Sequence, residues 1–376
     1  MKYGLVIQQN FYEKMKVDFF NLNKINKLIK KDVIKKISKL INQSSFVEGS
    51  TVKLFEEKFA KYCGTKYCVA VNNGTSALQL AIVVSKKNVK SKNVATPPNS
   101  FFATSASIKH AGLEPYFVDV NSNNFNINTD ILEKENKKFT GIIPVSLYGN
   151  PCNLTKIQSI AQNYNKFLVH DACQAHGALH KNKKIAEYSE LTCFSFYPSK
   201  NLGAFGEGGA IVTNNYDLYK ELSQLKNQGQ KERYHHNLLG FNFRMDEIQA
   251  AVLLIKLKYL DEWNDERISI ASRYINNLKD NKKIKLLQVN NDDKCVYHLF
   301  PIFTEYKNEL ISKFKKANIG FGFHYPVPIH EQPPFINSKS NFPSTSLSKD
   351  QQISLPIFIG IKKYEIDYVC DIINTL

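Results

Sequence analysis

The sequence lacks several features that would place it in a specialised class of protein. It has no run of about 18 or more apolar residues, so we expect no membrane-spanning helix. Its first residues lack the long apolar core and small-residue cleavage site of a signal peptide. The seven cysteines are scattered without a CxxC pair, so neither a metal site nor a disulfide framework is predicted. These absences favour a location in the reducing cytoplasm.

Arginine is also scarce, and this affects how the positive charge of the chain is interpreted. The formal net charge is +16, yet four of the 50 basic residues are arginine: Arg233, Arg244, Arg267 and Arg273. The lysines are spread along the chain, and stretches such as residues 24–40 are typical of a solvated amphipathic helix. The sequence therefore disfavours a nucleic-acid-binding protein, and an anionic small substrate suits the positive field equally well.

What the sequence does contain is a regular alternation of short apolar strands and helices. CVAV (68–71), KFLVHDA (166–172) and GGAIVTN (208–214) are predicted strands. They are apolar almost throughout, as expected for a mostly parallel, doubly wound α/β sheet that helices cover on both faces. Residues 15–60 show helical periodicity, and residues 247–278 form one long helical stretch or two helices.

Polar residues follow three of these strands, at the edge where ligands bind in parallel sheets. Gly74, Thr75 and Ser76 begin a helix whose backbone amides suit a phosphate, although such residues also make a plain helix cap. Asp171 ends an apolar strand, where a carboxylate is costly unless it is paired or caps a helix.

The third set surrounds Lys200, in FSFYPSKNLGAFGEGGAIV (194–212), among apolar, aromatic and glycine residues. An amine kept from water has a lowered pKa and becomes a nucleophile toward carbonyls, whereas a lysine that extends into solvent does not. A buried lysine, a buried acid and a phosphate cradle together match pyridoxal phosphate, which needs one of each for its aldehyde, its pyridine nitrogen and its phosphate.

The chain also resembles the DegT-type sugar-nucleotide aminotransferases, which are fold type I pyridoxal phosphate enzymes. From about Met15 to the C-terminus, the resemblance rests on NNGTSALQLAI, PPNSFFATSASI, HDACQAHGA, SFYPSKNLGAFGEGGAIVTN, RYHHNLLGFNFRMDEIQAAVL and HYPVPIHEQPPF. It implies an aspartate aminotransferase-like fold with a smaller C-terminal α+β domain. We expect an N-terminal extension (1–14), a large cofactor-binding domain with N-terminal helices (15–265) and a small domain (266–376).

The resemblance implies a role for each matching residue. Lys200 would bond to the cofactor aldehyde and then carry the proton, and Asp171 would pair with the pyridine nitrogen. The other expected cofactor-binding residues are Gly74, Thr75 and Ser195 at the phosphate, Phe101 stacked on the ring, Gln174 at the ring hydroxyl, and Asn242 at the phosphate of the neighbouring subunit. The expected sugar-binding residues are Tyr197, His324 and Tyr325. Such shared active sites would make a homodimer obligatory.

The activity implied by the resemblance is transfer of an amino group from glutamate to a nucleotide-linked keto sugar, for bacterial surface glycans such as lipopolysaccharide. FYPSKNLGA and HYPVPIH resemble relatives that aminate C3, whereas FHPxK is more typical of C4. We therefore expect a dTDP-3-oxo-6-deoxyhexose as substrate. A UDP-3-oxo sugar and a C4 reaction on a dTDP- or UDP-4-keto sugar are alternatives.

Two other functions are less consistent with these residues. Related dehydratases carry a histidine in place of the lysine, so Lys200 disfavours that chemistry. A non-catalytic regulator that binds pyridoxal phosphate would not need the complete set of Lys200, Asp171 and Gln174.

Overall fold

The described chain opens with an extended segment. This computed structural model describes residues 15–86, 89, 91–336 and 341–376, and the predicted N-terminal extension lies outside them. The helical pattern predicted from residue 15 is wrong at its start, because Val17 pairs with Ile319 in an isolated β-bridge. Val17 is buried in a core cluster of C-terminal residues, so tertiary packing overrides the local pattern there.

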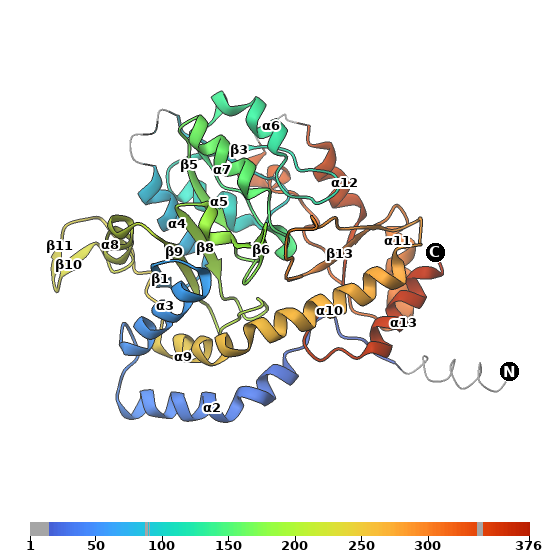
Figure 1. Cartoon of the computed structure of the whole chain (residues 1–376), viewed down its shortest axis with the longest axis horizontal. Helices are drawn as coiled ribbons and strands as arrows, with labels where there is room; N and C mark the ends of the chain where they lie inside the picture. The colour runs from blue at the N-terminus through green and yellow to red at the C-terminus, as the bar shows by residue number, and fades with distance from the viewer. Residues whose placement is uncertain (1–14, 87–88, 90, 337–340) are drawn as a thin grey trace.

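Two helices follow, α2 (Asn23–Asn42) and α3 (Ser50–Cys63). One side of α2 buries Ile25, Ile29 and Val33 in a cluster with Trp263, and α2 packs on α9 (Glu247–Lys256). Figure 1 shows α2 along the lower edge of the molecule, beneath α9. The lysines of α2 lie mostly on its exposed side, as expected for an amphipathic helix at the surface.

A mostly parallel sheet forms the centre of the molecule. Among the described residues it has seven strands in the order β1-β9-β8-β5-β4-β2-β3. Their bounds are β1 (Tyr67–Val71), β2 (Asn93–Thr96), β3 (Glu114–Phe117), β4 (Gly141–Ile142), β5 (Phe167–Asp171), β8 (Leu191–Ser195) and β9 (Gly209–Thr213). β9 is antiparallel to β1 and β8, and the other pairings are parallel. The predicted α/β class is confirmed.

Helices cover both faces of this sheet (Figure 1). In β1, Cys68 and Ala70 belong to a core cluster shared with α3, whereas Val69 and Val71 belong to another shared with α4. The helices between the strands are α4 (Gly74–Ser85), α5 (Phe102–His110), α6 (Thr129–Lys134), α7 (Leu154–Asn163) and α8 (Tyr216–Leu225). A strand buried on both sides must be apolar throughout, which explains the pattern in the sequence.

Two short hairpins branch from the central part. The first pairs β6 (Leu179–His180) with β7 (Lys183–Lys184). The second pairs β10 (Gln230–Glu232) with β11 (His235–His236), and it projects from the body next to α8 in Figure 1. We call this projecting hairpin the arm.

The C-terminal part builds a smaller α+β unit after the long helix α10 (Leu260–Leu278). Its described sheet is antiparallel, with strands β12 (Lys285–Leu286), β13 (Phe300–Phe303) and β14 (Gln352–Leu355). Its other helices are α11 (Lys307–Lys316), α12 (Pro343–Gln351) and α13 (Lys363–Asn374). Because α10 runs through the expected boundary between residues 265 and 266, the division into domains stays a prediction.

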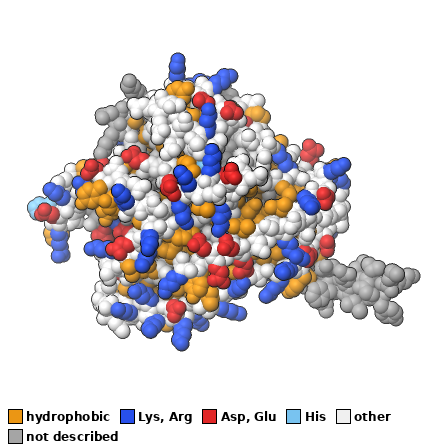
Figure 2. All heavy atoms as spheres, viewed as in Figure 1, with side chains coloured by type: hydrophobic (Ala, Val, Ile, Leu, Met, Phe, Trp, Pro, Cys, Tyr) orange, Lys and Arg blue, Asp and Glu red, His pale blue; other side chains and the backbone are white. Residues whose placement is uncertain are grey.

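The surface carries basic residues in many places. Figure 2 shows Lys and Arg side chains spread over one face of the molecule, with acidic side chains among them. In the described part of the chain, no helix combines the length and the apolar character needed to cross a bilayer.

Candidate active site

Nearly all of the predicted site residues line one cavity at the carboxyl ends of the parallel strands. The cavity has a volume of about 600 Å³. The predicted residues in its wall are Gly74, Thr75, Phe101, Asp171, Gln174, Ser195, Tyr197, Lys200, His324 and Tyr325. They come from segments far apart in the sequence, so the fold itself assembles the site.

The start of α4 forms one end of the cavity. The side-chain oxygen of Asn73 accepts a hydrogen bond from the N–H of Ser76 at 2.8 Å and thereby caps the helix. The amides of Gly74 and Thr75 at the helix start are among those without a partner inside the helix, as a phosphate site requires. A Cβ at Gly74 would lie 2.6 Å from the Cβ of Ser195, so only glycine lets α4 approach β8 this closely.

Asp171, at the end of β5, is held in place by two hydrogen bonds. Its side chain is buried, with 4% of its surface exposed. Thr104 on α5 donates its hydroxyl to Oδ2 at 2.8 Å, and the N–H of Cys173 donates to Oδ1 at 3.1 Å. A carboxylate fixed in this way can pair with a protonated ring nitrogen, and no helix begins directly after Asp171 for it to cap.

Lys200 lies in the turn between β8 and β9 and is half-buried in the cavity wall. Its backbone N–H donates to the carbonyl of Tyr197 at 2.8 Å, which closes the turn. Burial lowers the pKa of the Lys200 amine, and the nearby Cys173 and Asp171 oppose this shift. An amine with a lowered pKa next to a carboxylate is suited to carbonyl chemistry and to proton transfer.

Gln174 connects the sheet to the C-terminal unit. Its side-chain oxygen accepts a hydrogen bond from the N–H of Tyr148 at 2.7 Å, and its Nε2 donates to the hydroxyl of Tyr325 at 3.0 Å. The Tyr148 hydroxyl in turn donates to the carbonyl of His324 at 2.6 Å. These contacts fix the 324–325 segment over the cavity. Burial, together with the charge of Lys200, lowers the pKa of His324 to about 4, so its ring is neutral near pH 7.

Two aromatic side chains lie where the cavity meets solvent. Phe101 is 57% exposed and Tyr197 is 50% exposed, and both line the cavity. The Phe101 ring lies 5.7 Å from that of Tyr325 in a tilted arrangement. Such exposed rings can stack on a bound heterocycle or sugar.

Asn242 is the predicted site residue that does not line this cavity. Its side chain is exposed and its oxygen accepts hydrogen bonds from Nε and Nη2 of Arg244. Its backbone bridges to Asn227, at the base of the arm. Its place outside this cavity agrees with an expected role in a neighbouring subunit, and that role stays a prediction.

Several residues of the site were not identified from the sequence. Thr104, which orients Asp171, belongs to the quoted PPNSFFATSASI stretch, but nothing in its spacing indicates that contact. Tyr148 follows β4 in LYGN, so the rule that polar residues at strand ends bind ligands could have found it. His298, which also lines the cavity, comes from the C-terminal unit and has no such signal.

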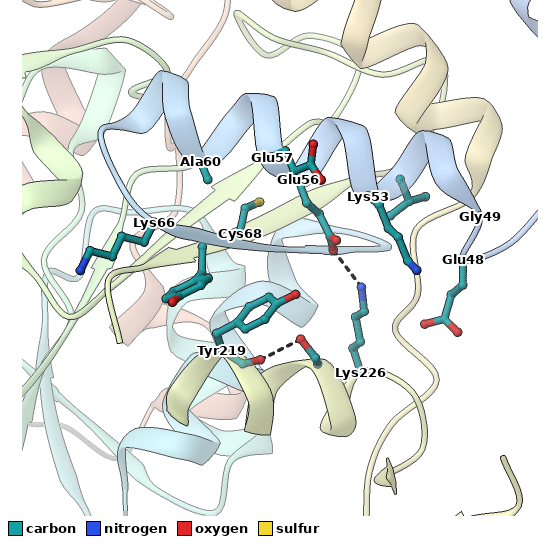
Figure 3. Close-up of a pocket in the computed structure, with 13 residues that line it drawn as sticks. Glu48, Gly49, Lys53, Glu56, Glu57, Ala60, Lys66, Cys68, Tyr219 and Lys226 are labelled. Carbon is teal, nitrogen blue, oxygen red and sulfur yellow. Dashed lines mark hydrogen bonds and ion pairs between the residues drawn. The ribbon is translucent and has the colours of Figure 1, made fainter. Parts of the chain in front are cut away.

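A second cavity, of about 570 Å³, lies between α3, β1 and α8 (Figure 3). Lys226 Nζ and Glu56 Oε1 point toward one another in it, 2.9 Å apart, and Oε1 also accepts a hydrogen bond from the N–H of Ala70. This buried cation is already paired, and none of the predicted site residues lines this cavity. It differs in both respects from the cavity around Lys200.

The geometry of the cavity around Lys200 fits pyridoxal phosphate. Gly74 leaves room at the start of α4, Asp171 presents a fixed carboxylate, and Lys200 presents an amine. The volume is in the range of cofactor and ligand pockets, roughly 300–1,000 Å³. The residues in the wall could therefore hold all three polar parts of the cofactor.

Comparison with known proteins gives a consistent result. The pattern of the DegT/DnrJ/EryC1/StrS aminotransferase family matches residues 27–374. Over 360 residues, the chain is 35% identical to the dTDP-3-amino-3,6-dideoxy-alpha-D-galactopyranose transaminase of Aneurinibacillus thermoaerophilus, covering 95% of this chain and 99% of that protein. Over 356 residues, it is 32% identical to the UDP-2-acetamido-2-deoxy-3-oxo-D-glucuronate aminotransferase of Pseudomonas aeruginosa, covering 94% and 98%.

A solved structure is similar over nearly the same extent. It is that of S. venezuelae DesV in complex with a ketimine intermediate, which has a TM-score of 0.91 and 31% sequence identity. The match covers 96% of this chain and 98% of that one. It thus includes both the central sheet and the C-terminal unit.

Proposed function

This chain belongs to the DegT/DnrJ/EryC1/StrS family of pyridoxal phosphate-dependent sugar-nucleotide aminotransferases, and we propose that it transfers the amino group of glutamate to the C3 keto group of a dTDP-3-oxo-6-deoxyhexose. The observation that carries the chemistry is that Lys200, Asp171 and the start of α4 share one cavity. The choice of C3 is supported by the FYPSKNLGA and HYPVPIH motifs. It is also supported by the names of the two relatives, one of which specifies a 3-amino sugar and the other a 3-oxo sugar.

The proposed mechanism assigns one task to each residue of the cavity. When bound, pyridoxal phosphate supplies an aldehyde for the amino group and a ring that delocalises negative charge from the substrate carbon. Lys200 Nζ removes the proton from the α-carbon of glutamate, and in the second half of the reaction it delivers a proton to the sugar carbon. Its lowered pKa keeps more of the amine unprotonated near neutral pH, as a base that works in both directions requires.

The remaining residues hold and orient. Asp171, fixed by Thr104 and by the N–H of Cys173, keeps the proton on the ring nitrogen. Gln174 has one N–H left for the ring hydroxyl, because its other groups contact Tyr148 and Tyr325. The phosphate is held at the start of α4 and by Ser195.

The proposal includes a homodimer with shared active sites. Asn242 lies outside its own chain's cavity and is exposed to solvent near the base of the arm. On this proposal its amide contacts the phosphate bound by the other chain. A chain that is active as a monomer at working dilution would contradict this part.

A UDP-linked 3-oxo sugar is a second candidate substrate, favoured by the relative from Pseudomonas aeruginosa, whose name specifies that nucleotide. The two candidates differ in the base, not in the reaction. Amination at C4 of a dTDP- or UDP-4-keto sugar would instead place the reacting carbon differently over Lys200.

The test is to supply the purified holoenzyme with glutamate and a panel of dTDP- and UDP-linked 3-keto and 4-keto sugars. We expect 2-oxoglutarate and a dTDP sugar with nitrogen on C3, identified by NMR. Nitrogen on C4, or turnover of UDP sugars alone, would refute the corresponding part.

Lys200→Ala is the matched control and should neither turn over nor retain cofactor after borohydride reduction and peptide mapping. A regulator would bind pyridoxal phosphate through Lys200 and yet exchange no amino group with glutamate. Borohydride labelling at another residue, or appreciable turnover by Lys200→Ala, would remove the basis of the mechanism.

A further inference from the structure

His298 lines the cavity that contains Lys200 and is anchored on its far side. Its side chain is buried, with 8% of its surface exposed. Its ring Nδ1 lies 3.3 Å from Oδ1 of Asn201, the residue that follows the predicted catalytic lysine. Its backbone is fixed as well, because Arg267 Nη1 donates to the carbonyls of Tyr297 and His298 at 3.1 and 3.4 Å. His298 is therefore held at its ring Nδ1 and at its backbone.

The hydrogen bonds of Asn201 determine which ring nitrogen carries the proton. Asn201 Nδ2 donates to the carbonyl of Val296 at 3.0 Å and to Oδ1 of Asn264 at 2.9 Å. A carbonyl can only accept, so the amide nitrogen must face Val296 and the amide oxygen must face His298. The orientation of Asn264 is fixed in the same way, because its Nδ2 donates to the carbonyl of His176 at 2.8 Å.

It follows that Nδ1 of His298 is the donor in its contact with Asn201. Burial lowers the pKa of His298 well below its usual range, and the charges of Lys200 and Arg267 act in the same direction. The ring is thus neutral, and a neutral imidazole with a proton on Nδ1 has a free lone pair on Nε2. In this tautomer, Nε2 of His298 is a hydrogen-bond acceptor in the cavity wall.

We propose that His298 is a positioning residue for the catalytic lysine, whose Nε2 accepts a hydrogen bond from the Lys200 ammonium group whenever the lysine is not bonded to the cofactor. A base that takes a proton and later returns it must keep that proton between the two steps. Its protonated form must therefore be held in the cavity, where the proton does not exchange with solvent. An acceptor that is neutral and fixed does this without adding charge. The inference rests on the proposed function only for the role of Lys200.

The other charged groups near the pair are consistent with this role. Asp171 and Cys173 are the groups that raise the pKa of Lys200, against burial. Near His298 the titratable neighbours are Lys200, Arg267, His176 and His324. The charge of each lowers the pKa of the His298 ring and so disfavours its protonated form. His298 therefore stays an acceptor, and its neutral dipole acts together with Asp171 to favour the ammonium form of Lys200.

The first test measures the tautomer of His298 in the wild-type protein. With ¹⁵N-labelled histidine, the ring shifts of His298 should show a protonated Nδ1 and an unprotonated Nε2 between about pH 6 and 9. The signal is assigned by its absence from His298→Gln. A protonated Nε2, or an imidazolium in this range, would overturn the proposal.

The second test measures Lys200 itself in cofactor-free protein. The rate at which an amine-reactive reagent labels Lys200 is followed against pH by peptide mass mapping. Because a hydrogen bond to a charged group is strong enough to shift a pKa by about one unit, His298→Phe should lower the labelling pKa of Lys200 by about that much. His298→Gln, which keeps an acceptor, should fall between the two, and the exposed Lys27 should not change.

The outcomes separate this inference from the proposed function. An unchanged labelling pKa in folded His298→Phe would refute the role of His298 and leave the amino transfer by Lys200 intact. Loss of labelling at Lys200 in the wild-type chain under all conditions would instead mean that the lysine is not accessible in the cavity, which would refute both.

Discussion

Replacing Gly74 by alanine tests the close approach between α4 and β8 on which the proposed phosphate site depends. The new Cβ would lie 2.6 Å from the Cβ of Ser195, 3.1 Å from its Oγ and 3.2 Å from its Cα. Carbon atoms in contact prefer about 3.5–4.0 Å, so the helix and the strand must separate by about 1 Å. Alanine on its own would favour the helix by up to about 1 kcal/mol, so the clash decides the sign.

The expected magnitude is that of overpacking, about 1–3 kcal/mol of lost stability. Ser195→Gly removes both Cβ and Oγ and leaves only the Cα at 3.2 Å, which a small shift accommodates. The pair of substitutions should therefore be more stable than the sum of the single effects, with a coupling free energy of about 1–2 kcal/mol.

The assay is urea unfolding of the cofactor-free protein, followed by circular dichroism, for the wild type, both single variants and the double variant. Cofactor affinity is measured on the same four proteins and should fall in all three variants, because each alters the start of α4 or removes the Ser195 hydroxyl. Strict additivity of the free energies of unfolding, or a stabilised Gly74→Ala protein, would show that α4 and β8 are not packed as described.

Three further predictions address the site and its support. Asp171→Asn should slow amino transfer by about 10²-fold or more, because an amide cannot keep the ring nitrogen protonated; near-normal turnover would contradict this. Tyr148→Phe should lower kcat/KM for the sugar about tenfold, because it loses the bond to the carbonyl of His324; an unchanged kcat/KM would contradict this. Burial lowers the pKa of Lys256 to about 8, so between pH 8 and 10.5 the unfolded chain keeps a proton that the folded chain releases, and stability rises with pH. Relative to Lys256→Met, which titrates nothing there, the wild type should gain about 2 kcal/mol from pH 7 to 9.5 in urea unfolding, and a flat difference would refute the shift.

The placement of the main site residues could be predicted from the sequence because it depends on one general rule. Asp171 and Ser195 end parallel strands, and Gly74 begins the helix after another, so the sheet necessarily brings them to one edge. The apolar strands that define this edge are recognisable from composition alone. The same rule, applied to β4, would also have included Tyr148.

What the sequence could not predict depends on contacts between remote segments. The bond from Thr104 to Asp171 requires a specific rotation of α5 over β5, and no local pattern encodes it. The segment around Val17 is extended although its pattern is helical, because its partner lies some 300 residues away, at Ile319. Tertiary packing decides in both cases, and propensity acts only as a weak preference.

The contacts of Gln174 have a consequence for how the site is completed. Its oxygen takes the N–H of Tyr148, and one of its two N–H groups takes the Tyr325 hydroxyl, so the amide is fixed and has a single N–H to offer the cofactor. Tyr325 belongs to the C-terminal unit, whereas Gln174 follows β5 in the central sheet. A cofactor that uses the remaining N–H therefore binds best when the C-terminal unit is packed against the sheet. By linkage, the bound cofactor stabilises that packing by the same free energy, which couples cofactor loading to the position of residues 324–325, the segment proposed to bind the sugar.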